Sequence, residues 1–224
     1  MKIKWGALVV DGRGKIGGHV ASKNLGGSYL RTKVTPTNPN TAFQSAVRAL
    51  FGAISAQWAG LTSSARASWA GAVSEWQQTD VFGDLKKPTG KALFQRLNNQ
   101  AQVVGLPAIA LPPAHLEMPI GIVSAIAIDT TAETLTLTGA DTDAATQVVV
   151  GATATLSDGT TSAGNKLRQT YYEAGDSFDS SAAYDAYVAR FGVPTVGGNV
   201  FGSVKYVLAS GQASPEQVLN IVIS

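Results

Sequence analysis

The stretch "GLPAIALPPAHLEMP" (residues 105–119) divides the chain into two parts with different sequence patterns. Its four prolines forbid a helix interior, because proline has no backbone N–H and clashes with the preceding turn. We therefore expect an extended linker over residues 106–118. Before it, apolar residues recur every three or four positions, and after it they alternate with polar residues. This change of period predicts an α+β protein, with helices in the first part and strands in the second.

Residues 37–105 are expected to form a small three-helix unit. Asn38 is a candidate N-cap, and Pro39 follows it at the first helical position, where proline costs no intrahelical hydrogen bond. Three apolar stripes with helical spacing follow: Phe43, Val47, Leu50, Ile54 and Trp58; Leu61, Ala65, Trp69, Val73 and Trp76; Leu93, Leu97, Ala101 and Val104. We predict that the three tryptophans form the core of this unit.

Residues 119–224 are expected to form six strands and one short helix, the helix over residues 180–192. The strands are "IGIVSAIAI" (120–128), "ETLTLTG" (133–139), "TQVVVGATATLS" (146–157), "KLRQTYY" (166–172), "NVFGSVKYVLA" (199–209) and "EQVLNIVIS" (216–224). Short strands separated by turn sequences are typical of an immunoglobulin- or fibronectin-like β-sandwich. We therefore expect an Ig-like β-sandwich over residues 119–224.

Residues 1–36 are glycine-rich and basic, with seven lysines and arginines against Asp11. The segment "SYLRTKVT" (residues 28–35) alternates like an edge strand, which puts Tyr29, Arg31 and Lys33 on one face. Because this region carries too little apolar surface to fold alone, we expect an extended arm that becomes ordered against another molecule. The candidate partner-binding residues are Arg13, Lys15, Lys23, Tyr29, Arg31 and Lys33.

The net charge of +2 hides a strong asymmetry between the two halves of the chain. Residues 1–101 hold thirteen basic and four acidic residues, a net charge of +9, whereas residues 102–224 hold four and eleven, a net charge of −7. Such a division indicates different surroundings for the two halves. It also allows the basic part of one copy to meet the acidic part of another.

The glycine, histidine and cysteine content argues against nucleotide binding and against histidine or cysteine catalysis. A P-loop would need Ser or Thr after its lysine, but Ile16 follows Lys15. His19 lies in the arm and His115 in the linker, neither of which is a rigid platform for a catalytic base. The chain has no cysteine, so a thiolate nucleophile or metal ligand is excluded.

The acidic residues do not form a recognisable site either. Asp141 and Asp143 lack the further ligands of a calcium loop. Glu173, Asp176 and Asp179 flank a loop and are explained as surface charges without invoking a carboxylate pair. We therefore expect no enzymatic activity, no cofactor, no metal and no small-molecule substrate.

The front of the chain carries no targeting segment that we recognise. The apolar run "WGALVV" (residues 5–10) is too short for a signal peptide, and no segment has the roughly 18 apolar residues of a membrane helix. We expect a soluble protein made and kept in a cytoplasm, without a membrane partner.

Three stretches in residues 12–100 resemble a group of uncharacterised proteins encoded by tailed bacteriophages and prophages: "GRGKIGGHVASKNLGGSYLRTKVTPTNPNT", "WAGLTSSARASWAGAV" and "DVFGDLKKPTGKALFQRLN". The resemblance implies a virion structural protein, either a head-decoration or minor capsid protein or a neck or tail component. Its implied partners are other virion proteins and copies of itself. Its implied location is the virion, after synthesis in the host bacterial cytoplasm. It supplies no catalytic residues.

Two other functions remain open at this point. The basic arm is also suited to non-specific DNA contact, because cationic arms gain affinity by displacing counterions from phosphates. A surface adhesin that acts through the C-terminal β-sandwich is the other alternative. A strap on a neighbouring subunit is favoured over the DNA arm, because the apolar pieces between the charges are suited to packing.

Overall fold

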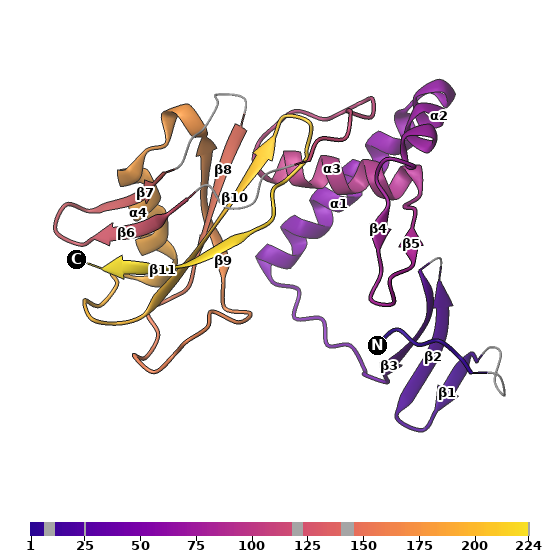
Figure 1. Cartoon of the computed structure of the whole chain (residues 1–224), viewed down its shortest axis with the longest axis horizontal. Helices are drawn as coiled ribbons and strands as arrows, with labels where there is room; N and C mark the ends of the chain where they lie inside the picture. Colours follow the sequence, from indigo (N-terminus) through magenta and orange to yellow (C-terminus); the bar gives the residue numbers. More distant parts are fainter. Residues whose placement is uncertain (7–11, 25, 118–122, 140–145, 224) are drawn as a thin grey trace.

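The computed structural model describes residues 1–6, 12–24, 26–117, 123–139 and 146–223. These residues form an α+β protein with four α-helices and a large curled mixed sheet (Figure 1). Two smaller antiparallel sheets accompany it, one at the front of the chain and one between the second and third helices. The α+β class predicted from the sequence is confirmed.

Residues 14–32 form a three-stranded antiparallel sheet in the order β1 (Gly14–Ile16), β2 (His19–Asn24) and β3 (Gly27–Thr32). The first residues of the chain pair with the outer edge of β3: Ile3 N–H donates to Ser28 O (3.0 Å) and Leu30 N–H donates to Met1 O (2.8 Å). The expectation of a single extended arm is therefore wrong. The backbone hydrogen bonds close within the segment, because Gly17 (φ +55°) adopts the left-handed conformation that a tight turn needs.

Three helices follow: α1 (Ala42–Gly60), α2 (Ser63–Ala72) and α3 (Gly90–Val103). Each has a threonine N-cap whose hydroxyl accepts a backbone hydrogen bond three residues on, which satisfies one of the free N–H groups of the first turn. Thr41 caps α1, so the prediction of Asn38 as its cap is wrong. Asn38 instead accepts a hydrogen bond from Arg48 (2.8 Å). Strands β4 (Gln78–Thr79) and β5 (Leu85–Lys86) form a hairpin between α2 and α3.

The core of the helical part lies where α2 and α1 pack against α3. Its buried members are Ile54, Trp69, Trp76, Leu93, Phe94 and Leu97. Trp58 packs against this cluster but is only partly buried, with its ring centroid 5.3 Å from that of Phe94. All three tryptophans predicted for the core therefore belong to the cluster or contact it.

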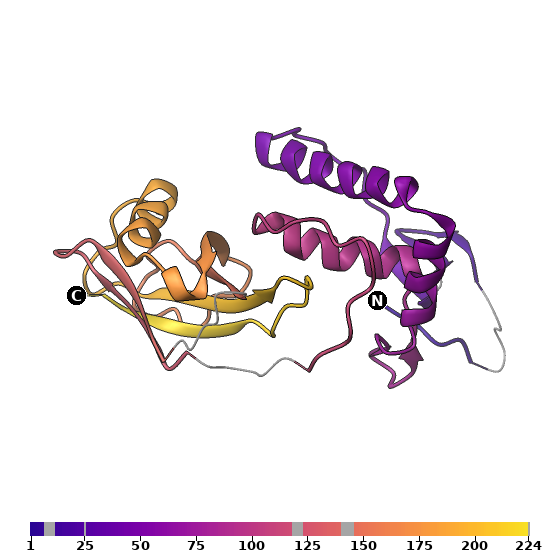
Figure 2. The same ribbon diagram turned by 90° about the horizontal axis from the view of Figure 1, so that it is seen from above.

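The first half of α1 is not part of this core. Phe43, Val47 and Phe51 are 71%, 49% and 52% exposed, although the predicted stripe included Phe43 and Val47. In Figure 2, α1 lies along α3 and its other side has no neighbouring element. Only the side that carries Ile54 is covered, so an apolar stripe on α1 remains at the surface.

The described residues of the C-terminal part form six strands: β6 (Ala125–Asp129), β7 (Thr134–Thr138), β8 (Thr146–Ala152), β9 (Arg168–Ala174), β10 (Val200–Leu208) and β11 (Gln217–Ile223). Their order in the sheet is β7-β6-β11-β10-β8-β9. The β6–β11 pair is parallel, with Ile126 opposite Ile221, and the other pairs are antiparallel. Six strands were predicted in this region, and all six are found.

The Ig-like β-sandwich is not confirmed. The described strands of this part form one curled sheet, and helix α4 (Ser180–Phe191) covers one of its faces (Figure 2). Tyr187 of α4 packs into the core of that face together with Val150 and Val204. The described residues thus contain four helices, one more than the number in the predicted three-helix unit. The fourth helix, α4, lies where the short helix over residues 180–192 was expected.

Residues 106–117 follow an extended path that side chains fasten to both parts of the molecule. Ile109 N–H donates to the Asn98 side chain (2.8 Å), which donates back to Ile109 O (3.2 Å). The Trp69 indole donates to Ala110 O (2.9 Å), and the Gln212 amide donates to Ala114 O (2.8 Å).

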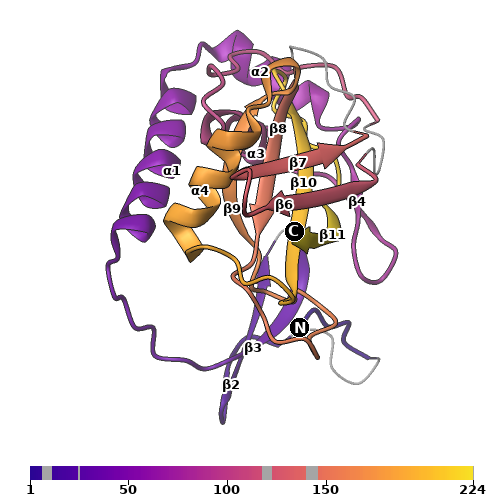
Figure 3. The same cartoon turned by 90° about the vertical axis from the view of Figure 1, so that its left-hand side faces the viewer.

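Figures 2 and 3 show α1 and α4 on the same side of the large sheet.

Candidate interaction surface

The N-terminal sheet lies at one end of the molecule, far from β6 and β7 (Figure 1). Its register places Lys15 opposite Val20 and Val20 opposite Arg31. Residues opposite one another in an antiparallel sheet share a face, so Lys15 and Arg31 lie on the same side. Tyr29, two residues before Arg31, shares that side, whereas Lys23 pairs with Ser28 and lies on the other.

Lys33 continues the same ladder beyond β3, because its N–H donates to Gly18 O (2.8 Å). Alternation therefore places Lys33 with Tyr29 and Arg31, as the sequence predicted for these three residues. We call Lys15, Tyr29, Arg31 and Lys33 the cationic face. Among the six predicted partner-binding residues, these four are brought together, Lys23 is not, and Arg13 lies exposed just before β1.

The positive charges of the cationic face have no counter-charge within the described residues. Lys15, Arg31 and Lys33 are exposed, and the ion pairs of the described chain, Lys2–Asp80 and Lys4–Asp84, involve none of them. A sheet with its charges unpaired in this way is suited to a partner that supplies carboxylates or phosphates.

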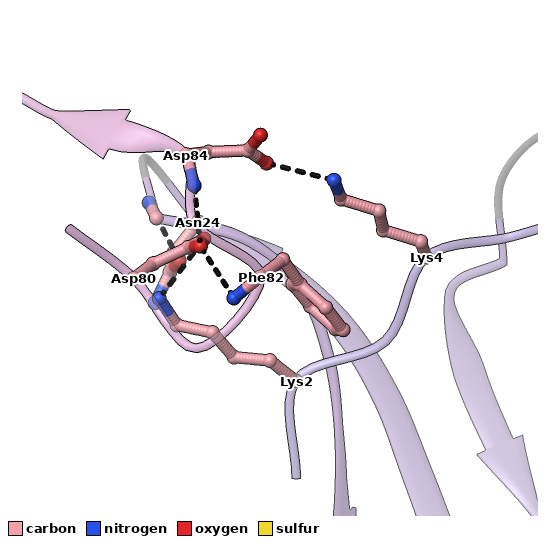
Figure 4. A network of polar contacts seen from close by, with 7 residues as sticks. Lys2, Lys4, Asn24, Asp80, Phe82 and Asp84 are labelled. Carbon is pink, nitrogen blue, oxygen red and sulfur yellow. Dashed lines mark hydrogen bonds and ion pairs between the residues drawn. The ribbon is translucent and has the colours of Figure 1, made fainter.

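The N-terminal sheet is attached to the β4–β5 hairpin by these two ion pairs (Figure 4). The Lys2 ammonium lies 3.5 Å from the Asp80 carboxylate, and the Lys4 ammonium lies 3.0 Å from that of Asp84. Lys4 also lies over the Phe82 ring, 5.1 Å from its centroid. Within the described part of residues 1–36, Ala21 is the one buried side chain, so these polar contacts and the backbone ladder hold the sheet in place.

Asp80 organises the loop that receives the N-terminal sheet. Its carboxylate accepts the N–H groups of Phe82 (2.8 Å) and Asp84 (3.1 Å) in addition to the Lys2 ammonium. Partial burial acts to raise the pKa of Asp80, but the two backbone N–H donors and the charge of Lys2 outweigh it and lower that pKa below its usual value. The carboxylate is therefore ionised at neutral pH and holds Lys2 as an ion pair.

The histidines and aspartates considered from the sequence have separate locations. His19 lies exposed in β2, and His115 packs edge-on against Trp76, with 4.7 Å between ring centroids. Asp141 and Asp143 lie outside the described residues.

Two of the three carboxylates near α4 have structural partners. Asp179 is the N-cap of α4 and accepts the N–H groups of Ser181 (2.9 Å) and Ala182 (3.1 Å). The hydrogen bonds from the Ser181 hydroxyl and these amides lower the pKa of Asp179. Glu173 accepts the Tyr171 hydroxyl and the Asp179 N–H, and burial together with Glu173 raises the pKa of Tyr171. These contacts explain Glu173 and Asp179 without a catalytic role.

A second exposed surface was missed by the sequence reasoning, which placed two of its residues, Phe43 and Val47, in the apolar stripe of the helical unit. Phe43 and Val47 of α1, with Val103 of α3 and Tyr172 of β9, line an open groove of about 590 Å³. Arg190 of α4 also lines it and donates to Gln169 O (2.9 Å) at the edge strand of the large sheet. One sequence signal could have indicated this exposed surface: α2 and α3, the two helices available to cover the apolar stripe of α1, are both shorter than α1.

No described helix is long and apolar enough to cross a bilayer. No group of three or more histidine, aspartate or glutamate side chains in the described chain lies close enough together to hold a metal ion.

Comparison with known proteins found no matching family model, no similar curated sequence and no similar solved structure.

Proposed function

We propose that this chain is a non-enzymatic structural protein of a tailed-bacteriophage particle, which docks on neighbouring subunits through its cationic face. The resemblance of residues 12–100 to phage-encoded proteins supports the virion assignment. A head-decoration or minor capsid protein and a neck or tail component both fit this role. The partners are other virion proteins and further copies of this chain.

The cationic face is the observation that carries the proposal. Lys15, Arg31 and Lys33 are exposed on one side of a sheet at the end of the molecule, and no described carboxylate pairs with them. A neighbouring subunit with an acidic surface supplies the missing counter-charges. Because residues 102–224 carry a net charge of −7, a second copy of this chain is one such neighbour.

The exposed stripe on α1 gives further support. Phe43, Val47 and Phe51 are each about half exposed or more. A row of large apolar side chains at the surface is more common where a partner covers it. The relation of residues 119–224 to the immunoglobulin-like modules of phage particles is also part of the proposal, and it rests on the six strands alone.

The test uses a charge reversal on the cationic face. A Lys15→Glu/Arg31→Glu/Lys33→Glu variant is compared with Lys87→Glu/Lys91→Glu/Lys166→Glu, which makes the same charge change at exposed lysines elsewhere. Each is supplied as the sole copy during particle production, and DNA-filled particles are purified on a density gradient.

The native chain and the control variant are expected in the particles at a fixed stoichiometry, and the cationic-face variant is expected to be lost from them. Circular dichroism and thermal unfolding verify that both variants fold. If the native chain does not enter particles, the virion assignment fails. If the cationic-face variant enters as well as the control, docking through this face is refuted.

Non-specific DNA binding is the second candidate, because the same unpaired charges favour it. Fluorescence anisotropy with a duplex of arbitrary sequence tests it over a range of salt concentrations. Each phosphate neutralised by a lysine or arginine contributes a slope of about 0.9 to the fall of log affinity with log salt. A DNA-binding role predicts tight binding with such a slope, lost in the cationic-face variant, whereas a purely structural role predicts no binding at physiological salt.

A further inference from the structure

A second candidate site lies where the helical part meets the large sheet. It is a pocket of about 470 Å³ lined by α3, by the chain after α2, by the linker and by the β10–β11 hairpin. Its polar side chains include Trp76, Arg96, Gln100, His115, Glu117 and Gln212. We call it the junction pocket. It is built from four separate segments and is distinct from the cationic face.

Arg96 contributes a charge without a counter-charge. Its side chain is half-buried, and the desolvation that accompanies burial lowers its pKa. Its guanidinium lies over the Trp76 ring, 5.2 Å from the centroid, and pairs with no carboxylate among the described residues. Moving a guanidinium out of water costs free energy unless an anion pairs with it.

Trp76 contributes a hydrogen-bond donor without an acceptor. Its side chain is 4% exposed, and its indole Nε1 is buried with no hydrogen-bond partner in the described structure. Buried polar groups in folded proteins are nearly always paired, so each exception calls for an explanation. Because the nitrogen is closed to the pocket, it is not a donor to a ligand in this conformation. The Trp76 ring lies against the Arg96 guanidinium, so its indole N–H signal can report on binding at Arg96.

The remaining lining of the junction pocket decides which anion fits. Leu97, Leu116 and Pro215 provide apolar walls, which suit a carbon skeleton rather than a bare inorganic ion. Glu117 also lines the pocket, and its charge disfavours a doubly charged phosphate more than a singly charged carboxylate. The planar guanidinium matches the two oxygens of a carboxylate in a bidentate arrangement.

We propose that the junction pocket binds an organic carboxylate, with Arg96 as the ion-pair partner. The carboxylate sits on an apolar stem that contacts Leu97 and Pro215. It is supplied either by the C-terminus of a peptide or by an acidic side chain, and the chemistry is the same in both cases. This proposal does not depend on the virion role.

The test follows the indole N–H of Trp76 by ¹H–¹⁵N NMR of the full chain, with the signal assigned from Trp76→Phe. N-acetyl-leucine represents a C-terminal carboxylate, and N-acetylglutamate α-amide represents a side-chain carboxylate. N-acetyl-leucine methyl ester and inorganic phosphate are the controls. We expect a saturable shift with at least one of the two carboxylates, about tenfold weaker binding of phosphate, and no saturable shift with the ester.

Variants at Arg96 separate binding from a general change of the fold. Arg96→Gln is expected to weaken carboxylate binding about tenfold or more, and Arg96→Lys is expected to retain part of it, because the charge remains while the planar fork is lost. Lys91→Gln on the same helix is the matched control and is expected to bind like the native chain. Glu117→Gln is expected to tighten binding, because it removes a competing negative charge.

The proposal is overturned if neither carboxylate shifts the Trp76 signal, if the ester or phosphate binds as tightly as the carboxylates, or if Arg96→Lys and Arg96→Gln bind like Lys91→Gln. Should Arg96→Gln fail to fold, the comparison of acid with ester on the native chain decides the question. The more tightly bound of the two carboxylates identifies which kind of carboxyl group the pocket prefers.

Discussion

The side chain of Asn98 gives the sharpest test of how the linker is held. Asn98 is fully buried in α3, and its amide makes a two-way contact with the backbone of Ile109. Asn98→Ala leaves the N–H and C=O of Ile109 without these partners. Each buried backbone group left unpaired costs about 1–3 kcal/mol. Because Ile109 is only partly buried and water reaches it in part, we expect a loss of about 2–4 kcal/mol for the pair.

Urea unfolding followed by tryptophan fluorescence measures this loss. Asn99→Ala is the matched control, because Asn99 is the next residue of the same helix and makes no side-chain hydrogen bond within the described structure. We expect the control to change stability by less than about 0.5 kcal/mol. If Asn98→Ala costs no more than Asn99→Ala, the side chain does not fasten the linker, and the reasoning is refuted.

Three further predictions concern the core, the junction and the N-terminal sheet. Trp69→Ala is expected to cost about 3–5 kcal/mol in the same assay, because the ring is fully buried edge-on against Phe94; a loss under 1 kcal/mol would contradict its core role. Gly211→Ala is expected to lower the free energy of unfolding by at least about 2 kcal/mol, because Gly211 has a φ of +72° and a Cβ there would lie 2.3 Å from Leu97 O. Unchanged stability would show that the backbone at this turn moves enough to accept the Cβ. The folded-state pKa of Asp80 is lowered, so its contribution is present above its usual pKa and is lost as the pH falls through the folded value. Protection factors of the β3 amides, which correct the exchange rates for their intrinsic pH dependence, should therefore fall on acidification in the native chain. In Asp80→Asn they should be low already at neutral pH and change little with pH; equal profiles would argue against the ion pair.

The positions of helices and strands were largely predictable, because periodicity is a local signal. The alternation of Leu135 and Leu137 with threonines predicted β7. The helical spacing of the stripe from Leu61 to Trp76 predicted α2, which ends earlier, at Ala72. Helix ends were less certain: Asn38 and Thr41 are both good caps, and the structure uses Thr41. The choice depends on backbone conformation, and Asn40 between them has a positive φ of 48°.

The arrangement of these elements was not predictable in the same way. Glycine pairs such as Gly17-Gly18 were interpreted as loosening an arm, although the same residues make the turns of a small sheet. The parallel pairing of Ile126 with Ile221 joins distant segments and leaves no local pattern. The contact of Lys2 with Asp80 is equally non-local.

The candidate sites also differ in how far local sequence patterns could predict them. The sequence placed Tyr29, Arg31 and Lys33 on one face because alternation within a strand is local. It could not bring Lys15 to them, since that depends on the register of β1 with β2. The junction pocket was missed because Trp76, Arg96 and Gln212 come from separate segments that only the tertiary structure assembles.

The central place of β11 has a consequence for synthesis on the ribosome. β11 lies between β6 and β10, so β6 and its hairpin partner β7 cannot join the rest of the large sheet until residues 217–223 have been made. The helical cluster, which residues 50–109 supply, can assemble earlier, as elements made first generally do. The nascent chain therefore passes through a stage in which the edge of β6 is open, and that stage is where a chaperone or a misplaced strand from another chain would compete with the final fold.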